Sequence, residues 1–356
     1  MEIGVLLKQA VEQKASDLHL TAGMPPTIRS NGLLIRLTNV TLKPENTRSM
    51  AEQLFDQRRL TAFKKEGELG YAHSYPGVGR FRVNVFYQRG TIGLAIRIIQ
   101  AEIPTIGSLG LPDIVLKMAQ RPSGLILITG PAGSGKTATL AAMINYINEN
   151  RQCHIITLED PIEYLHSHKN CIINQREIGS DSRSFPSALR AALYQDPDVI
   201  MVGEMRDLET VSAAVTAAET GKLILASVHT LNAHQTIRHI INVFPADRKE
   251  QIRVQLADTL VGIISQRLIP RKDGKGRVAA VEFLAATPAI NNLILEGKIK
   301  QINTTMQTGA KAGMRTMDNH LRYLYRKGMI SAENALKNAA DHFSVSRYIY
   351  EKSPLK

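Results

Sequence analysis

Apolar positions near the start of the chain recur every three or four residues. The residues that keep this spacing are Ile3, Leu6, Leu7, Ala10 and Val11. They fall on one face of a helix, which predicts an amphipathic helix packed against a core. The pattern then changes to the alternation typical of a strand over residues 16–20, which glycine and proline end at 23–26. We therefore expect an N-terminal helix followed by a short strand.

Residues 80–99 alternate between apolar and polar on both sides of the dipeptide Arg89-Gly90. A two-residue turn there predicts a β-hairpin and fixes its register. One face of this hairpin is then wholly apolar, which supports the register: Phe81 faces Ile98, Val83 faces Ile96, Val85 faces Leu94 and Tyr87 faces Ile92. On the other face Arg82 would lie opposite Arg97, and like charges in that position are destabilising. These arginines are therefore expected either to share an anion or to be solvated separately.

From Gly124 onward, short apolar runs alternate with helical patterns. The runs lie at 125–128, 155–158, 199–202 and 223–227. This alternation predicts a parallel α/β sheet. Prolines and glycines after residue 99 predict a linker, and the chain after Thr287 is predicted to be mostly helical. We therefore expect an N-terminal domain at 1–99, a linker at 100–112, an α/β core at 113–286 and a helical extension at 287–356.

The segment GPAGSGKT at 130–137 fits the phosphate-binding pattern G-x-x-x-x-G-K-[ST]. An apolar run precedes it and a helical pattern follows, so the glycine-rich loop would lead from a strand into a helix N-terminus that favours anions. Lys136 is expected to reach the β- and γ-phosphates, and the Thr137 hydroxyl to bind Mg²⁺. The expected nucleotide-binding residues are Gly130, Pro131, Ala132, Gly133, Ser134, Gly135, Lys136, Thr137 and Ala138. The alternative is a purely structural glycine-rich turn.

Carboxylates follow two of the apolar runs. The candidates are Glu159, Asp160, Glu163 and Glu204. Because the carboxyl ends of parallel strands line the ligand crevice, these acids are candidates to face the γ-phosphate, position water and complete the metal shell. They could instead cap helices or pair with surface bases. His229, just after another run, is a candidate phosphate sensor or a structural residue.

Several segments together resemble the PilT family of secretion and pilus ATPases. They are SDLHL at 16–20, RFRVN at 80–84, AIR at 95–97, TLEDPIEYLH at 157–166, DPDVIMVGEMRD at 196–207 and GKLILASVHT at 221–230. The resemblance covers nearly the whole chain. It implies a RecA-like P-loop ATPase core of α/β class, an N-terminal PAS-like α/β domain and a helical C-terminal extension.

The resemblance also implies functional residues and an assembly. ATP and Mg²⁺ would be the cofactors, held between domains and neighbouring subunits of a homohexameric ring. Glu204 and Glu163 would be the preferred carboxylates, in contact with Mg²⁺ directly or through water. His229 would sense phosphate, and Arg82 and Arg97 would bind anions at a domain or subunit interface.

Within the superfamily, the resemblance implies a type IV pilus retraction ATPase, which removes pilin subunits and powers twitching motility. Assembly ATPases of this group usually carry a tetracysteine zinc site, and this chain has only Cys153 and Cys171. The segment AINNLILE at 289–296 resembles the family's retraction motif AIRNLIRE, but Asn291 and Leu295 replace its two arginines. A pilus-assembly or accessory secretion ATPase therefore remains an alternative. The implied partners are an inner-membrane pilus platform protein and a paralogous ATPase.

Charge leaves one further question open. The chain has 356 residues and a net charge of +12, and residues 247–356 contain 19 basic and 10 acidic residues. A basic segment can bind nucleic acid, an anionic membrane surface or an acidic partner, or can simply aid solubility. A nucleic-acid translocase is the alternative from another class. Aromatic residues make up 5% of the chain and Trp is absent, so stacking platforms are scarce and no nucleic acid is expected.

The remaining composition favours a globular cytoplasmic protein. Apolar residues make up 44% and charged residues 21%, which excludes disorder as the main content. No apolar run reaches the roughly 18 residues needed to span a bilayer. Glu2, Lys8 and Glu12 interrupt any signal-peptide pattern. We therefore expect a cytoplasmic protein, peripheral at the inner membrane through its partners.

Overall fold

The computed structural model describes residues 2–30, 32–99 and 102–352. The chain forms two compact units. The first comprises Met1–Glu102 together with Pro161–Leu165, and the second comprises Ile103–Asp160 together with His166–Lys356. Residues 100 and 101, where the expected linker begins, lie outside the described residues.

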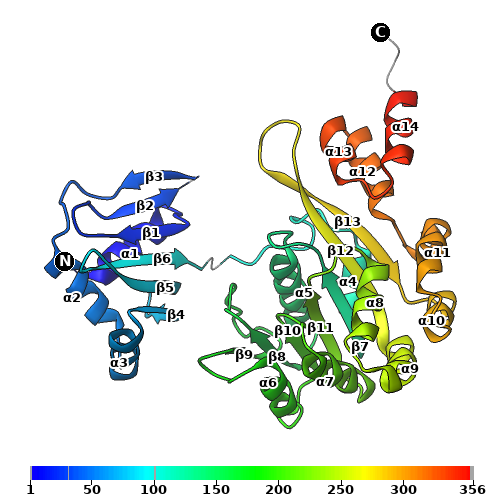
Figure 1. The fold of residues 1–356 in the computed structure, drawn as a ribbon, viewed down its shortest axis with the longest axis horizontal. Coiled ribbons are helices and arrows are strands. Elements are labelled where there is room, and N and C mark those ends of the chain that lie inside the picture. Colours follow the sequence, from blue (N-terminus) through cyan, green and yellow to red (C-terminus); the bar gives the residue numbers. More distant parts are fainter. Residues whose placement is uncertain (1, 31, 100–101, 353–356) are drawn as a thin grey trace. The chain divides into compact units, whose positions relative to one another are not determined.

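The first unit contains a six-stranded antiparallel sheet with strand order β3-β2-β1-β6-β5-β4 (Figure 1). Its elements are α1 (Ile3–Glu12), β1 (Asp17–Leu20), β2 (Thr27–Ser30), β3 (Leu33–Arg36), α2 (Pro44–Leu54), α3 (Gln57–Glu66), β4 (Glu68–Tyr75), β5 (Gly79–Gln88) and β6 (Thr91–Ile98). The predicted helix and first strand are confirmed as α1 and β1. The apolar face of α1 packs into the same core as the inward face of the sheet.

The predicted hairpin is confirmed in its register. Phe81 pairs with Ile98, Val83 with Ile96, and Arg82 with Arg97. Both turn residues have positive φ, 46° at Arg89 and 73° at Gly90, as a two-residue hairpin turn of the primed type requires. Six apolar side chains of this hairpin are buried, whereas Tyr87, near the turn, is 50% exposed. Arg82 and Arg97 are exposed.

The second unit contains a seven-stranded sheet with strand order β13-β12-β7-β11-β10-β8-β9. All neighbouring strands are parallel except the antiparallel pair β12–β13. The strands are β7 (Gly124–Thr129), β8 (His154–Glu159), β9 (Ile172–Glu177), β10 (Val199–Val202), β11 (Leu223–Val228), β12 (Leu260–Pro270) and β13 (Arg277–Ala285). The four predicted core strands are confirmed as β7, β8, β10 and β11, whereas β9, β12 and β13 extend the sheet beyond the prediction.

Helices cover both faces of this sheet (Figure 1). Leu125 and Leu127 of β7 point into a core shared with α6 (Phe185–Ala192), α7 (Leu208–Glu219), α8 (Ala233–Asn242) and α9 (Lys249–Thr259). Ile126 and Ile128 of the same strand point to the opposite core, with α4 (Ile114–Ala119) and α5 (Lys136–Asn150). Because β7 is buried on both faces, it has the continuous apolar sequence of an internal parallel strand.

The chain after β13 is helical, as the sequence predicted. Its helices are α10 (Pro288–Leu295), α11 (Ile302–Thr308), α12 (Met317–Arg326), α13 (Ala332–Asn338) and α14 (His342–Lys352). The last three form an apolar cluster with Ile269 of β12 and Ala280 of β13. His320 of α12 also fastens this region to the sheet, because its Nδ1 atom accepts a hydrogen bond of 2.8 Å from the backbone N–H of Val281. No helix among the described residues is long and apolar enough to cross a membrane.

Candidate functional site

The predicted phosphate loop joins the end of β7 at Thr129 to the start of α5 at Lys136. Gly130 has a φ of +149°, and a Cβ atom there would lie 2.3 Å from the carbonyl oxygen of Gln266 on β12. Only glycine therefore fits between the loop and the neighbouring strand. The tight entry lets the rest of the loop turn back over the N-terminus of α5.

The polar groups of this loop suit an anionic phosphate. The Lys136 ammonium donates hydrogen bonds to the carbonyl oxygens of Gly130 at 2.9 Å and Pro131 at 3.1 Å, so it lies over the loop. The Ser134 hydroxyl is buried without a hydrogen-bond partner among the described residues. Backbone N–H groups at a helix N-terminus favour a phosphate, and the half-buried Thr137 hydroxyl lies in the first turn of α5. These residues fit a nucleotide phosphate, and Thr137 fits an Mg²⁺ ligand.

Glu204 and His229 meet beside each other at the ends of adjacent strands. Glu204 follows β10 and His229 follows β11, and the parallel register aligns Val202 with Ala226. The His229 Nε2 atom lies 2.9 Å from Glu204 Oε1. The Glu204 side chain is 19% exposed and also forms an ion pair with the exposed Arg206. The predicted pairing of Glu204 with a surface base therefore exists alongside its contact with His229.

The charge of His229 depends on its neighbours. Burial lowers the pKa of His229 below its usual value, and the positive charge of Lys136 lowers it further, whereas Glu204 acts in the opposite direction. Because the net shift is downward, His229 is neutral at pH 7. A neutral imidazole can donate a hydrogen bond from one ring nitrogen and accept one at the other. The electrostatic contact with Lys136 places this pair close to the phosphate loop.

The acids after β8 have separate environments. The Glu159 carboxylate is 4% exposed and accepts hydrogen bonds from the Thr157 hydroxyl at 2.6 Å and the Gln175 side-chain amide at 3.0 Å. Asp160 is exposed. Glu204, with a smaller contribution from Asp160, raises the pKa of Arg206. The Glu159 side chain is therefore buried and held by hydrogen bonds at the carboxyl end of β8. Asp160 contributes negative charge near Glu204 and Arg206.

The other three expected site residues lie in the first unit. Arg82 and Arg97 are paired across the hairpin, and with Glu163 they line a cavity of about 310 Å³. The Arg97 Nε atom donates to Asp17 Oδ1 at 3.0 Å. Arg97 therefore has a carboxylate of the chain as one partner, and its side chain remains 69% exposed. The structure thus divides the expected residues into one group around the phosphate loop and another in the first unit.

A buried acid that the sequence analysis missed joins three elements of the second unit. Glu282 of β13 accepts hydrogen bonds from the backbone N–H groups of Ala233 at 2.7 Å and Met317 at 3.4 Å, at the starts of α8 and α12. Burial raises the pKa of Glu282 above its usual value, although these hydrogen bonds oppose that shift. Ser265 lies between Glu282 and Thr129, the last residue of β7.

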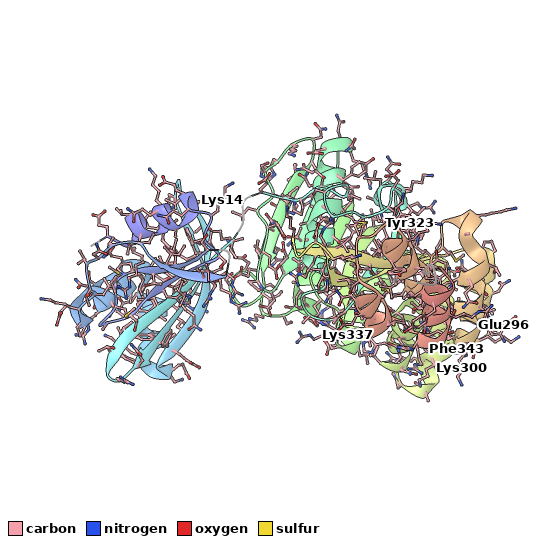
Figure 2. All side chains as sticks on the ribbon, turned by 90° about the horizontal axis from the view of Figure 1, so that it is seen from above. Lys14, Glu296, Lys300, Tyr323, Lys337 and Phe343 are labelled. Atoms are coloured by element: carbon pink, nitrogen blue, oxygen red, sulfur yellow. The ribbon has the colours of Figure 1, made fainter. Side chains whose placement is uncertain are left out.

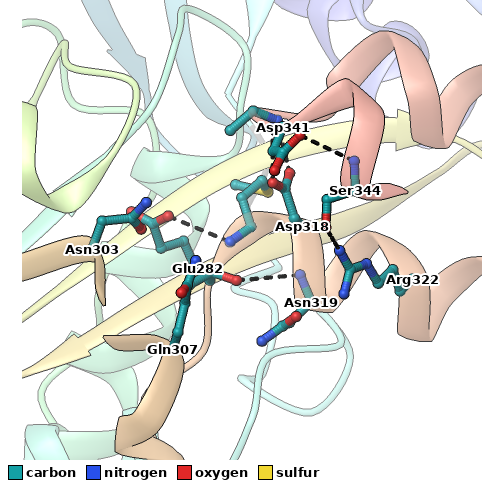
Figure 3. A pocket seen from close by; sticks show the side chains of 11 residues that line it. Glu282, Asn303, Gln307, Asp318, Asn319, Arg322, Asp341 and Ser344 are labelled. Carbon is teal, nitrogen blue, oxygen red and sulfur yellow. Dashed lines mark hydrogen bonds between the residues drawn. The ribbon is translucent and has the colours of Figure 1, made fainter. Parts of the chain in front are cut away.

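Glu282 also forms part of the wall of a polar cavity of about 490 Å³, which Asn319 and Arg322 of α12 line as well (Figure 3). The sequence did not indicate that Glu282 joins these elements, because the VEF segment that contains it is part of an apolar run. A charged residue within such a run was the available signal, since a buried carboxylate requires hydrogen-bond donors. Glu282 therefore connects the strand before the phosphate loop with the helix after His229 and with the helical extension.

Comparison with known proteins gives the site a family context. Residues 80–342 match the family model described as type II/IV secretion system protein. The chain is 45% identical over 339 residues to the Pseudomonas aeruginosa type IV pilus retraction ATPase PilT, covering 95% of this chain and 98% of that protein. It is 44% identical to the type IV pilus ATPase PilU of the same organism, covering 95% and 89%.

Solved structures agree with this relationship. The chain matches a crystal structure described as the pilus retraction motor PilT with bound ADP, with a TM-score of 0.91 and 48% identity, over 98% of this chain and 99% of that one. It also matches the ATPase DotB of Legionella pneumophila, with a TM-score of 0.76 and 26% identity, over 94% of each chain. The expected α/β fold, nucleotide binding and ATPase class are thereby confirmed. The chain belongs to the PilT/PilU family of type II/IV secretion ATPases.

Proposed function

We propose that this chain is a hexameric ATPase motor that powers retraction of type IV pili, removing pilin subunits and driving twitching motility. The observation that carries the proposal is its similarity, along 95% of its length, to a relative described as a pilus retraction ATPase. The proposal extends to this chain what that description says of the relative. ATP is the substrate, and the residues around the phosphate loop supply the chemistry.

Each residue near the loop has a role that follows from its contacts. Lys136, with the N–H groups of the loop, binds the phosphates and neutralises their charge. Glu204 orients the attacking water, and neutral His229 holds the Glu204 carboxylate in place and senses whether the γ-phosphate is present. A bound Mg²⁺, held by Thr137 and, directly or through water, by Glu204, would neutralise charge that develops on the phosphates. Glu163 is proposed as a further carboxylate for this metal ion in the assembled ring.

Arg82 and Arg97 complete the proposed machinery from the first unit. A hydrogen bond to Asp17 occupies the Nε atom of Arg97, but a guanidinium carries further N–H donors and the Arg97 side chain is 69% exposed. Both arginines are therefore proposed to stabilise charge on a nucleotide, as arginines supplied from outside the core do in other P-loop enzymes. In the ring, each nucleotide would lie between neighbouring subunits.

The partners follow from the same proposal. An inner-membrane pilus platform protein would receive the motion of the ring, and a paralogous ATPase could act beside it. The motor would work in the cytoplasm, peripheral at the inner membrane through these partners.

A deletion strain tests the direction of force. Cells without this protein should carry excess surface pili and fail to twitch, and the wild-type gene should restore both traits while a Glu204→Gln variant should not. Absent pili would contradict retraction and indicate an assembly ATPase. Unchanged pili and motility would contradict a role as pilus motor altogether.

Measurements on the purified protein distinguish a motor from an accessory ring subunit and from a nucleic-acid translocase. Steady ATP hydrolysis by the protein alone would exclude a purely accessory role, which Asn291 and Leu295 in the 289–296 segment suggest. Stimulation of turnover by DNA or RNA that disappears with added salt would instead favour a translocase. Molar mass in solution with bound nucleotide should correspond to six chains.

A further inference from the structure

A positively charged cavity lies in the second unit, apart from the cavities described above. It has a volume of about 740 Å³ and is lined by residues of α8 and α9, by residues 297–301 between α10 and α11, and by Asn303 of α11. We call it the basic cleft. Its charged and titratable lining residues are His234, Arg238, Lys249, Arg253, Lys298 and Lys300. No Asp or Glu lines it in the described part of the chain, and none of residues 130–138 does, so it is separate from the phosphate loop.

The positive charges of the basic cleft are mostly unpaired. Lys298 forms an ion pair of 2.8 Å with Glu296, and both side chains are half exposed. Arg238, Lys249, Arg253 and Lys300 have no ion pair among the residues described. Lys300 and Glu296 lie at the surface of the second unit (Figure 2). Cations that lie close together repel one another, and this repulsion destabilises the folded protein. A bound anion would relieve the repulsion.

Arg253 is the part of the cleft built most tightly into the fold. Its side chain is half buried, and its Nε atom is buried without a hydrogen-bond partner among the described residues. Gly297 has a φ of +71°, and a Cβ atom there would lie 2.7 Å from the Arg253 Nη1 atom. Glycine at 297 therefore leaves room for the guanidinium. A buried donor without a partner is costly, and an anion in the cleft would provide acceptors for the other N–H groups of the same guanidinium.

The rest of the wall is partly apolar and partly amide, since Asn242, Gln301 and Asn303 also line the cleft. Ile241 and Ile299 line the cleft beside the cations. Burial lowers the pKa of His234 below its usual value, and the nearby Arg238 lowers it further. The volume lies within the range of small-molecule sites, roughly 300–1,000 Å³. The cleft thus offers several cations and an apolar surface at the scale of a small ligand.

We propose that the basic cleft binds a phosphate-bearing small ligand, with its phosphates against Arg238, Arg253 and Lys300 and its apolar part against Ile241 and Ile299. Arginine is well suited to this role, because the guanidinium forms charge-assisted and bidentate hydrogen bonds with phosphate oxygens. The phosphates can belong to a soluble metabolite or to the head group of an anionic phospholipid. This site accounts for part of the excess positive charge that the motor function leaves unexplained.

The test uses the full-length protein saturated with Mg-ADP, so that the phosphate loop is occupied. Calorimetric titration with inorganic pyrophosphate measures the soluble source. Co-sedimentation with vesicles of phosphatidylglycerol and phosphatidylcholine measures the lipid source, with pure phosphatidylcholine vesicles for comparison. The variant Arg238→Glu/Lys300→Glu reverses two charges in the cleft. The control variant Lys275→Glu/Lys311→Glu makes the same change in charge at exposed positions outside it.

We expect the wild-type protein to bind at least one probe, and the cleft variant to bind it about tenfold or more weakly, since hydrogen bonds between charged groups are lost. The control variant should bind like the wild type, and both variants should keep the basal ATPase rate and the melting temperature. Binding to pyrophosphate identifies a soluble ligand, and binding only to phosphatidylglycerol vesicles identifies a lipid. The proposal is overturned if neither probe binds, if both variants weaken binding equally, or if a single-stranded oligonucleotide binds far more tightly than either probe.

Discussion

The His229 Nε2 atom lies 2.9 Å from the Glu204 Oε1 atom, although the whole of α7 separates the two residues in the chain. The contact exists because β10 and β11 are parallel neighbours whose carboxyl ends meet at one edge of the sheet. The Ser227 hydroxyl, one strand position before the end of β11, donates to the Gly203 carbonyl oxygen at 2.5 Å. The backbone on both sides of the pair is therefore fixed, and a change in either side chain should affect chemistry more than folding.

Replacing Glu204 by Gln should abolish ATP turnover without abolishing ATP binding. The substitution keeps the shape of the side chain but removes the charge that orients water, so we expect kcat to fall by about 100-fold or more. Nucleotide affinity should change far less, because Lys136 and the loop are intact. Steady-state kinetics and equilibrium binding measure the two effects separately. Glu209→Gln, an exposed acid on α7, is the control, and a Glu204→Gln variant with a wild-type rate would contradict the assignment.

Replacing Lys136 by Ala should instead weaken nucleotide binding. The ammonium that lies over the loop would be lost, together with its hydrogen bonds to Gly130 and Pro131. Titration with a fluorescent ADP analogue should show little or no binding, whereas Lys117→Ala, on the exposed side of α4, should bind normally. Normal affinity in Lys136→Ala would mean that the phosphates are held elsewhere.

His320 should make the stability of the protein depend on pH. Burial lowers its pKa from 6.5 to about 4, and the neutral ring accepts the Val281 N–H. Because the folded-state pKa is depressed, the stabilising contribution is fully present above pH 6.5 and is lost as the pH falls toward 4. The melting temperature should therefore fall over this range.

The variant His320→Gln separates this titration from the hydrogen bond. Its amide oxygen can accept from the Val281 N–H, but the side chain does not ionise. We expect a smaller decrease in melting temperature between pH 6.5 and 4 than in the wild type. Identical pH profiles for the two proteins would show that His320 does not carry the effect.

Replacing Glu282 by Gln should destabilise the second unit. The Glu282 carboxylate accepts hydrogen bonds from two backbone N–H groups, from Ala233 at Oε1 and from Met317 at Oε2. The amide of glutamine has only one acceptor oxygen. One buried N–H group would lose its partner, at a cost of about 1–3 kcal/mol. Urea denaturation should detect this loss, and Glu333→Gln at the exposed start of α13 should change stability much less. Equal stability of both variants would contradict the bridging role of Glu282.

The sequence predicted those parts of the fold that depend on local patterns. The hairpin register followed from its turn and its paired apolar residues, and the core strands followed from continuous apolar runs. The strand β9 was missed because Ile172–Glu177 mixes apolar with polar and charged residues. The pair β12–β13 was missed because its membership of the sheet depends on pairing between β12 and β7, far apart in the chain.

The site residues, too, could be predicted only where the signal lies within one short segment of the chain. The phosphate loop is contiguous, so its residues could be predicted together. Glu204 and His229 could be predicted one by one, but their contact depends on the order of strands in the sheet. The Arg97–Asp17 ion pair joins residues 80 positions apart, so it had no local signal. Glu282 is locally visible only as a charge within an apolar run, because the N–H groups that it accepts from belong to two distant helices.

The hydrogen bonds of Glu282 limit where the protein can be truncated without loss of folding. A protein shortened at residue 286 would keep this carboxylate but lose the Met317 N–H that it accepts from, and would expose the apolar surface of Ile269 and Ala280 that α12 to α14 cover. Core and helical extension are thus parts of one cooperative folding unit. A fragment that ends before α10 should aggregate, so dissection of this motor by truncation is better replaced by point substitution.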